Sequence, residues 1–305
     1  MVGIGRRKVG WILDADYRSF FDTVSHEWLV RFLEHRIGDE RLIRLIRKWL
    51  KAGVLEDGIT IEGKVGTPQG ATVSPLLANI YLHYVFDLWA QQWRKRQARG
   101  EMIMVRYADD SVVGFEREQD AKRFLTDMRA RSEAFGLSLN PDKTRLIRFG
   151  RFAALNRKER GLGKPETFNF LGFTLICSNK RNGGFQIRRR TRCDRMQATL
   201  QRVKEELQLR RHEPIPKQGQ WLAQVIRGFN AYHAVPTNYR SLVLFRDRVT
   251  RLWKRALMRR GQRATVPWRR MMQLRDDYLP SPRILHPWPE RRFDVKTQGG
   301  SRVPK

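Results

Sequence analysis

Short apolar runs alternate with longer stretches of helical spacing along the first half of the chain. The runs are rich in β-branched and aromatic residues and are bounded by polar turn residues, a pattern typical of strands. They predict strands over residues 9–16, 102–105 and 112–115, and a loop followed by a strand within residues 140–147. Between them, apolar residues three and four positions apart predict helices that begin at Ser25, near residue 42, at Ser74 and near residue 119. This order predicts an α+β fold with a mostly antiparallel sheet.

Residues that start and stop helices support these boundaries. Ser25 and Ser74 are expected to cap helix N-termini, with Pro75 at the first helical position. Gly136 is expected to end the helix that starts near residue 119, because glycine readily adopts the left-handed conformation found there. A short hairpin is expected over residues 58–65.

The second half of the chain changes character. Residues 150–166 are polar and glycine-rich and predict a surface loop, whereas residues 168–175 and 184–187 predict a second hairpin. Beyond them the hydrophobic period is helical, in segments near 193–210, 219–233 and 238–260. The last stretch is rich in Pro and Arg, lacks a hydrophobic period and is expected to be an extended arm. The length of the chain suggests about two domains.

The chain is strongly basic. Its 305 residues include 61 Lys and Arg against 31 Asp and Glu, a net charge of +30. Basic residues become denser after residue 145, as in Arg188-Arg189-Arg190 and Arg210-Arg211. Such a field attracts a polyanion by counterion release, so nucleic acid is the expected partner, ahead of an anionic membrane surface.

The remaining composition argues against several classes. Cys177 and Cys193 form no C-x-x-C pair and have no His at ligand spacing, which disfavours a zinc site and a disulfide framework. No apolar run reaches the ~18 residues that a membrane span requires, and the N-terminal residues lack the apolar stretch of a signal peptide. A cytoplasmic location is therefore expected.

Three acidic residues at strand ends are the strongest candidates for chemistry. Tyr107-Ala108-Asp109-Asp110 separates two apolar runs, which places Asp109 and Asp110 at the tip of a predicted hairpin. On that ground alone an ordinary acidic turn is the simpler interpretation, because Asp is common in turns. Asp16 changes the balance, since it ends another apolar run. Three carboxylates on adjacent strand ends suit two divalent metals about 4 Å apart, the usual arrangement for nucleotidyl transfer.

Two other acids and one loop compete for roles at this site. Asp14 alternates with Asp16 on one strand face and is the main competitor as a ligand. Asp22 follows a bend and is expected to be structural or capping. The loop at residues 66–70 lacks the Gly-Lys-Ser/Thr end of a P-loop, so Gln69 is a better candidate for contacting an incoming nucleotide than the loop is for cradling phosphates.

Several sequence blocks, in this order, resemble those of reverse transcriptases. They are Asp16-Tyr17-Arg18-Ser19-Phe20-Phe21-Asp22 with His26, Thr67-Pro68-Gln69-Gly70, Ser74-Pro75-Leu76-Leu77-Ala78-Asn79, Tyr107-Ala108-Asp109-Asp110, Gly136-Leu137-Ser138-Leu139 with Lys143-Thr144, and Phe170-Leu171-Gly172-Phe173. Their form resembles the bacterial group II intron-encoded reverse transcriptase/maturases. Residues 227–233, the helix through Trp253, and Arg292-Phe293 with Gly299-Gly300-Ser301-Arg302 resemble the maturase, or thumb, domain of that family.

The resemblance implies a fold and a set of site residues. Residues 1–178 would be a polymerase palm with partial fingers, 179–262 a helical thumb/maturase domain and 263–305 a basic C-terminal arm. Asp16, Asp109 and Asp110 would hold two Mg²⁺ ions, with Mn²⁺ as an alternative, and Lys143 would donate a proton to the pyrophosphate leaving group. The residues that would contact the nucleotide are Arg18, Phe21, Gln69 and Gly70, with Phe21 as the gate against a ribose 2′-OH. Phe170 to Phe173 would form either the primer grip or plain sheet core.

The resemblance also implies RNA-binding residues in the helical part. The expected phosphate contacts include Arg188, Arg189, Arg190, Lys204, Arg227 and Arg255. Trp221, Tyr232 and Trp253 could stack on bases, although aromatic residues at helical spacing, such as Trp253, are more often core. The expected partners are intron RNA, an RNA template with a DNA primer, and dNTPs, with no membrane; a homodimer is left open.

The chain departs from the family pattern near its N-terminus. The first catalytic strand is predicted from residue 9, where family members carry a preceding fingers region, so an N-terminal truncation is expected. The Cys and His pattern of an appended endonuclease domain is not found in the sequence. The expected function is an RNA-directed DNA polymerase of a group II intron with a maturase role in splicing. The alternatives are an RNA-binding maturase without polymerase activity and a remnant fragment.

Overall fold

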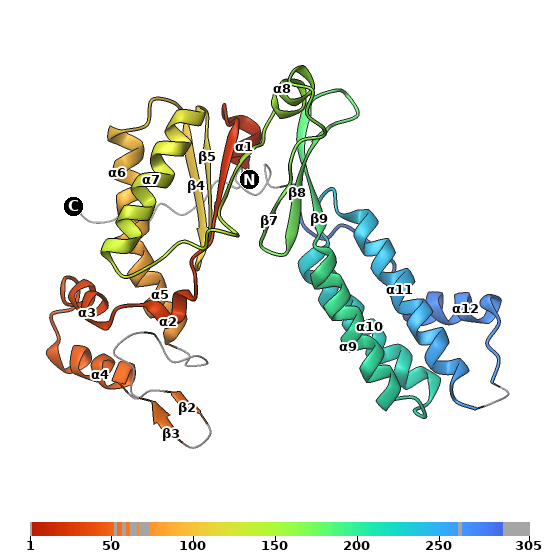
Figure 1. Ribbon diagram of the computed structural model, residues 1–305. Helices are drawn as coiled ribbons and strands as arrows, with labels where there is room; N and C mark the ends of the chain where they lie inside the picture. Colours follow the sequence, from red (N-terminus) through yellow and green to blue (C-terminus); the bar gives the residue numbers. More distant parts are fainter. Residues whose placement is uncertain are drawn as a thin grey trace, which may run out of the picture. The chain divides into compact units, whose positions relative to one another are not determined.

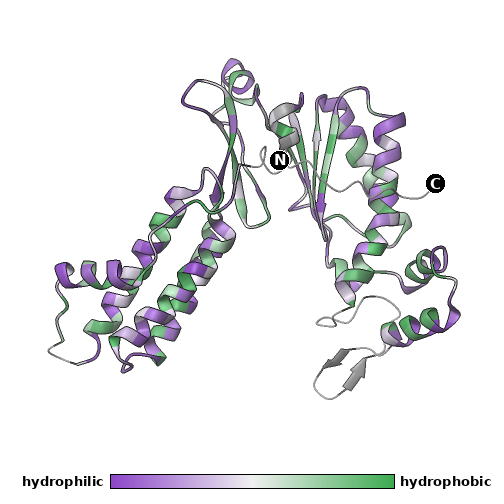
Figure 2. Ribbon diagram, turned by 180° about the vertical axis from the view of Figure 1, so that it is seen from behind, coloured by the Kyte–Doolittle hydropathy of each residue, from purple (hydrophilic) through white to green (hydrophobic). Residues whose placement is uncertain are grey.

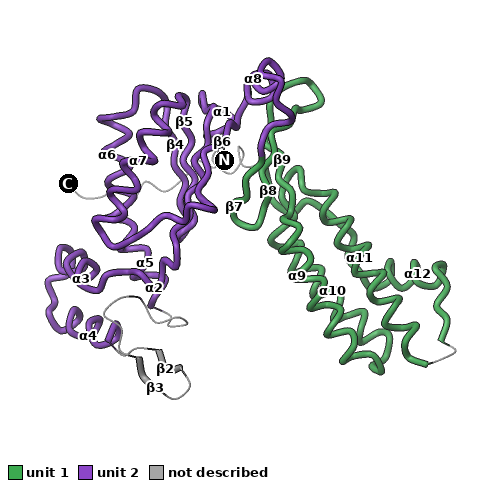
Figure 3. Tube along the Cα trace, viewed as in Figure 1, with its two compact units in different colours: residues 1–2, 167–305 green, residues 3–166 purple. Residues whose placement is uncertain are grey.

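The computed structural model describes residues 2–51, 54–56, 59–61, 66, 73–261 and 264–288. These residues form two compact units, which divide between Glu166 and Thr167 (Figure 3). Each has a hydrophobic core of its own, and they are called the N-terminal and the C-terminal unit below. The predicted boundary after residue 178 would fall inside strand β8 (Phe173–Asn179). This strand belongs to the same compact unit as the helices that follow it.

A four-stranded antiparallel sheet forms the centre of the N-terminal unit (Figure 1). Its strand order is β4-β5-β1-β6, made by Met102–Tyr107, Asp110–Phe115, Trp11–Ala15 and Arg145–Arg148. The register of the two central strands sets Ala15 opposite Ser111 and Asp14 opposite Val112. The predicted α+β class with a mostly antiparallel sheet is confirmed.

Helices cover one face of this sheet (Figure 1). α5 (Ser74–Leu82), the π-helical turn η1 (His83–Asp87) and α6 (Leu88–Arg96) follow one another without a break, and α7 (Glu118–Ala134) packs beside them. The core between helices and sheet includes Leu13, Val113, Phe115, Tyr81 and Phe124. Because side chains alternate along a strand, the odd-numbered residues Leu13 and Ala15 face the helices, and Asp14 and Asp16 face the other way.

Shorter elements complete the N-terminal unit. They are α1 (Val2–Arg6), α2 (Phe20–Thr23), α3 (His26–Glu34), α4 (Glu40–Lys51), β2 (Val54–Glu56), β3 (Ile59–Ile61) and α8 (Ala153–Glu159). Ser25 caps α3 as predicted, since its side chain accepts a hydrogen bond from the Trp28 N–H at 3.4 Å. Gly136 has a φ of 72°, the left-handed conformation expected after α7.

Two local predictions in this unit were wrong. Ser74 is the first residue of α5 and is buried, while Val73 occupies the cap position without a side-chain hydrogen bond. Residues 150–166 are not loop throughout, because α8 begins at Ala153, whose side chain is buried.

The C-terminal unit combines a small sheet with four helices in its described part. β7 (Phe168–Phe170), β8 and β9 (Phe185–Thr191) pair in sequence order, followed by α9 (Cys193–Leu209), α10 (Ile215–His233) and α11 (Tyr239–Met258). The three predicted helices are confirmed, and the predicted second hairpin is found as β8 and β9, although residues 168–175 hold two strands, β7 and the start of β8. Figure 2 shows the polar and apolar residues that alternate around these helices, whose buried sides meet in a core that includes Phe245 and Trp253.

The predicted extended arm is wrong for part of its length. Residues 268–278 form helix α12 (Trp268–Tyr278), with Met271 and Leu274 buried in the core of the unit. These two residues and Tyr278 share one face of the helix, a stripe too short to stand out among the arginines around it. Residues 289–305 lie outside the described part of the chain. None of the described helices has the length and hydropathy needed to cross a bilayer.

Candidate active site

The acidic hairpin joins β4 to β5 through a two-residue turn. Tyr107 pairs with Asp110, which leaves Ala108 and Asp109 at the tip. Ala108 has a φ of 54°, in the left-handed region that a residue with a Cβ adopts only at a cost. The turn is therefore held by the structure around it rather than by its own preference.

The register of β1 and β5 brings the predicted ligands together. Since Ala15 lies opposite Ser111, the next residues outward, Asp16 and Asp110, are neighbours on the face away from the helices. The Ser111 hydroxyl donates to the Ala15 carbonyl at 3.2 Å and ties the two strands at this end. Asp16 and Asp110 thus adjoin each other, with Asp109 at the tip of the same hairpin.

Lys143 lies against these carboxylates. Its Nζ is 2.9 Å from Asp16 Oδ2, on a side chain that is 68% exposed. The hydrogen bond to Asp16 raises the pKa of Lys143, and the charges of Asp16, Asp110 and Asp109 raise it further. The ammonium group is a cation held in the combined field of the three predicted ligands.

The donor set suits a hard divalent cation, although the side chains are not arranged around one. Carboxylate oxygens are the ligands that Mg²⁺ and Mn²⁺ prefer, and a cation already lies in the field of all three. Among the described residues, no three potential ligand side chains are grouped closely enough to form a ready metal site. The residues therefore fit a metal site by chemistry and by strand position.

Asp14 has a different environment on the same strand face. Burial raises its pKa to about 6; Arg145, 3.6 Å away across the β1–β6 ladder, opposes this effect, and the charges of Asp110 and Asp16 add to it. Asp14 is one strand repeat further from the hairpin tip than Asp16 and is paired inside the sheet. Of the two, Asp16 is the neighbour of Asp110.

The residues predicted to contact the nucleotide are only partly described. Arg18 is exposed, and Phe21 is half-buried in α2 with its ring 5.4 Å from that of Phe20. Gln69 and Gly70 lie outside the described residues. Gly66, which is described, donates its N–H to the Val24 carbonyl at 2.8 Å.

His26 also contacts Gly66, a role that sequence reasoning missed. Its Nε2 is 2.5 Å from the Gly66 carbonyl and acts as the donor, so it carries the proton. The only sequence signal was the presence of His26 within the first block, without a partner that spacing could identify.

The block Phe170–Phe173 is a tight turn between β7 and β8. Leu171 and Gly172 have φ values of 46° and 73°, and Phe170 is buried. The Tyr232 hydroxyl donates to the Leu171 carbonyl at 2.9 Å, and the Tyr232 ring stacks on Phe173 at 5.7 Å. Tyr232 is thus engaged in supporting this turn.

The predicted RNA-binding arginines do not share one surface. Arg188 and Arg190 are exposed, whereas Arg189, on the other face of β9, is half-buried, and burial lowers its pKa. Arg227 and Arg255 are exposed on α10 and α11. Trp253 is fully buried and donates to Gln218 Oε1 at 2.8 Å, so its interpretation as core is confirmed.

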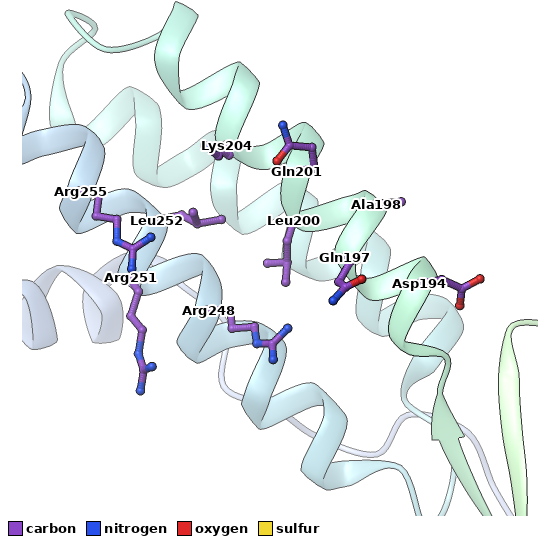
Figure 4. Close-up of a pocket in the computed structure, with 10 residues that line it drawn as sticks. All are labelled: Asp194, Gln197, Ala198, Leu200, Gln201, Lys204, Arg248, Arg251, Leu252 and Arg255. Carbon is purple, nitrogen blue, oxygen red and sulfur yellow. The ribbon is translucent and has the colours of Figure 1, made fainter.

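A basic groove of about 660 Å³ runs between α9 and α11 (Figure 4). Its cationic lining residues are Lys204, Arg248, Arg251 and Arg255, all exposed. None of them forms a salt bridge within the described part of the chain, and the single acid, Asp194, is bound by Arg192 at 2.6 Å. Arg248 and Arg251 were missed in the sequence, where their helical spacing with Arg255 was the available signal.

Comparison with known proteins agrees with this geometry. Residues 5–175 match the family model for reverse transcriptase (RNA-dependent DNA polymerase). A protein of Schizosaccharomyces pombe, "Uncharacterized 91 kDa protein in cob intron", is 29% identical over 187 residues, 45% of this chain and 23% of that protein. "Protein YkfC" of Escherichia coli is 30% identical over 214 residues, 60% of this chain and 51% of that protein.

A third relative is named as a group II intron-encoded protein. "Group II intron-encoded protein LtrA" of Lactococcus lactis is 44% identical over 73 residues, 24% of this chain and 12% of that protein. The chain spans about half, or less, of the length of each of these relatives. The match covers most of the N-terminal unit, including β1 and the acidic hairpin, and the chain therefore belongs to the reverse transcriptase family and is similar to intron-encoded members of it.

Proposed function

We propose that this chain is an RNA-directed DNA polymerase that extends a DNA primer on an RNA template by two-metal nucleotidyl transfer. The observation that carries the proposal is the side-by-side position of Asp16 and Asp110 at the ends of paired strands, with the Lys143 ammonium in their field. Asp16, Asp109 and Asp110 would hold two Mg²⁺ ions, or Mn²⁺ in their place. Bound there, such ions lower the pKa of a primer 3′-hydroxyl and stabilise charge on the leaving group.

The remaining predicted residues would act on the nucleotide and the leaving group. Phe21, half-buried at the start of α2, would reject a ribose 2′-OH, and Arg18 and Gln69 would contact the incoming nucleotide. Lys143, whose Nζ lies 2.9 Å from Asp16 Oδ2, would donate a proton to the pyrophosphate leaving group.

The groove between α9 and α11 supports nucleic-acid binding by the C-terminal unit. Exposed cations that form no salt bridge with any described residue suit phosphates, because pairing then displaces bound counterions and not a protein carboxylate. Intron RNA is the ligand that the relatives' names favour. A maturase role in splicing, without polymerase activity, is the second candidate function on this observation.

Primer extension tests the first proposal. With poly(rA) as template, oligo(dT) as primer and dTTP with Mg²⁺, Asp109→Asn is expected to lower the rate at least about 10³-fold, because each metal contributes several kcal/mol to the transition state. Asp277→Asn, an exposed carboxylate on α12, is the control of equal charge change. An unchanged rate in Asp109→Asn contradicts the proposal; RNA binding by a wild-type chain without extension favours the splicing role.

A further inference from the structure

A partly buried arginine lies directly behind the acidic hairpin. Arg106 belongs to β4, and its side chain, 13% exposed, points to the helix-covered face of the sheet. Its guanidinium donates from Nε to Asp87 Oδ1 at 2.8 Å and from Nη2 to Asp87 Oδ2 at 2.6 Å. Such a two-pronged pair fixes the orientation of the guanidinium as well as its position.

The third nitrogen of the same guanidinium reaches the hairpin turn. Nη1 donates to the Ala108 carbonyl at 2.8 Å and to Asn79 Oδ1 at 2.8 Å. Ala108 is the left-handed residue of the turn and precedes Asp109 and Asp110. Arg106 therefore links the strained turn to Asn79 of α5 and Asp87 of η1.

The π-helical turn explains why Asp87 can take this position. In η1 the Leu88 N–H bonds to the His83 carbonyl, five residues back, and the wider turn changes the direction of the side chains that follow. The carbonyls of Tyr84 and Val85 accept hydrogen bonds from Arg131 of α7, each at 3.3 Å. The π turn is thus stabilised from one side by α7 and presents Asp87 to β4 on the other.

We propose that Arg106, fixed by Asp87, is a positioning residue that holds the acidic hairpin in the conformation required for its carboxylates to bind metal. The position of the hairpin is inferred from the four hydrogen bonds of Arg106. The effect on metal binding and catalysis rests on the proposed function. Arg106 acts on the hairpin through the Ala108 carbonyl. Positional errors of about 1 Å at a reacting centre can cost on the order of 100-fold in rate.

Hydrogen exchange of the full chain tests the positioning without relying on catalysis. In Arg106→Gln the amides of residues 104–112 are expected to exchange at least ~10-fold faster, because the turn loses its charged donor. Arg123→Gln is the matched control, since Arg123 donates to Gln97 and stacks on Trp93 in the same unit without contacting the hairpin. Unchanged exchange at the hairpin in Arg106→Gln overturns the proposal.

A charge swap separates positioning from a stabilising ion pair. Asp87→Arg with Arg106→Asp keeps the opposite charges but leaves residue 106 without a donor for the Ala108 carbonyl. The swap is expected to recover thermal stability but to leave primer extension about 10- to 100-fold below wild type, with KM for dTTP within about twofold. Recovery of the rate together with stability overturns the proposal.

Where Arg106→Gln fails to fold, Arg106→Lys replaces it in the hydrogen-exchange test, because a single ammonium cannot reproduce the two-pronged hydrogen bonding of the guanidinium.

Metal binding supplies the third measurement. With Mn²⁺ alone, followed by its electron paramagnetic resonance, half-saturation is expected at about tenfold higher concentration in Arg106→Lys than in wild type or Arg123→Gln. Equal half-saturation overturns the inference. A wild-type chain that binds no Mn²⁺ and extends no primer contradicts the proposed function instead, and the hydrogen-exchange comparison then decides on the positioning by itself.

Discussion

At the scale of single residues, two carboxylates on one strand have different neighbours. Asp14 is paired with Arg145 inside the sheet, whereas Asp16 adjoins Asp110 and the Lys143 ammonium. We expect Asp16→Asn to lower primer extension at least about 10³-fold and Asp14→Asn less than about tenfold, because only Asp16 is placed to share a metal with the hairpin. Primer extension with matched circular dichroism spectra checks this. Equal losses in the two variants would identify Asp14 as a ligand too.

Another residue-scale prediction concerns His233 at the end of α10. Its ring lies against Phe229 at 4.3 Å and Phe173 at 5.4 Å, and burial lowers its pKa to about 4. The unfolded chain, with a His pKa near 6.5, therefore binds the proton more readily, and stability falls as pH decreases from about 6.5 to about 4. The loss is about 1–3 kcal/mol, reduced from the full linkage value because the ring is partly exposed.

Chemical denaturation of the full chain between pH 7 and pH 4 measures this effect. His233→Phe is expected to flatten the pH dependence of the free energy of unfolding of the C-terminal unit. His212, exposed after α9, provides the same substitution as a control and leaves the pH dependence in place. Parallel curves for wild type and His233→Phe would exclude His233 as the source.

At the scale of elements, α10 and α12 approach closely at one glycine. A Cβ on Gly219 would lie 2.4 Å from Cγ of Tyr278, whose ring also packs edge-on against Trp253. Gly219→Ala is therefore expected to destabilise the C-terminal unit by about 1–3 kcal/mol through overpacking. Gly228, on the same helix with open space around it, is the control, where Ala is expected to stabilise by up to about 1 kcal/mol. Thermal unfolding of both variants checks the opposite signs.

Elements with local signals could be predicted from the sequence, and those that depend on distant partners could not. The strand ends at Asp16 and at the acidic hairpin follow from apolar runs beside turn residues, and the Ser25 cap and Gly136 follow from local backbone chemistry. Helix α12 has only a short apolar stripe, and its stability comes from packing on α10 and α11. The hydrophobic period of a sequence therefore predicts a helix well when much of its surface is buried. It gives only a weak signal for a helix such as α12, which buries few residues.

The same distinction holds within the candidate site. Asp16, Asp109 and Asp110 could be found because each ends an apolar run, so strand pairing alone brings two of them together. The role of Arg106 could not be predicted, because its partner Asp87 lies in a π-helical turn and no residue pattern predicts such a turn. The division of Arg188 and Arg189 onto opposite faces of β9 follows from strand alternation, once the strand is known to continue through them.

At the scale of the whole molecule, the net charge of +30 attracts RNA over a long range. The groove between α9 and α11 allows the effect of local charges to be measured separately from that overall field. Each phosphate that a cation neutralises contributes nearly one unit to the slope of log K against log salt. Arg248→Gln with Arg251→Gln is therefore expected to reduce that slope by about 2 in filter-binding or fluorescence titrations with a structured RNA. Arg269→Gln with Arg283→Gln removes the same charge from exposed positions outside the groove and is expected to change the slope by less than about 0.5, because only long-range attraction is lost. Equal changes in the two double variants would mean that RNA responds to the summed field alone, and the groove would then have no role as a binding surface.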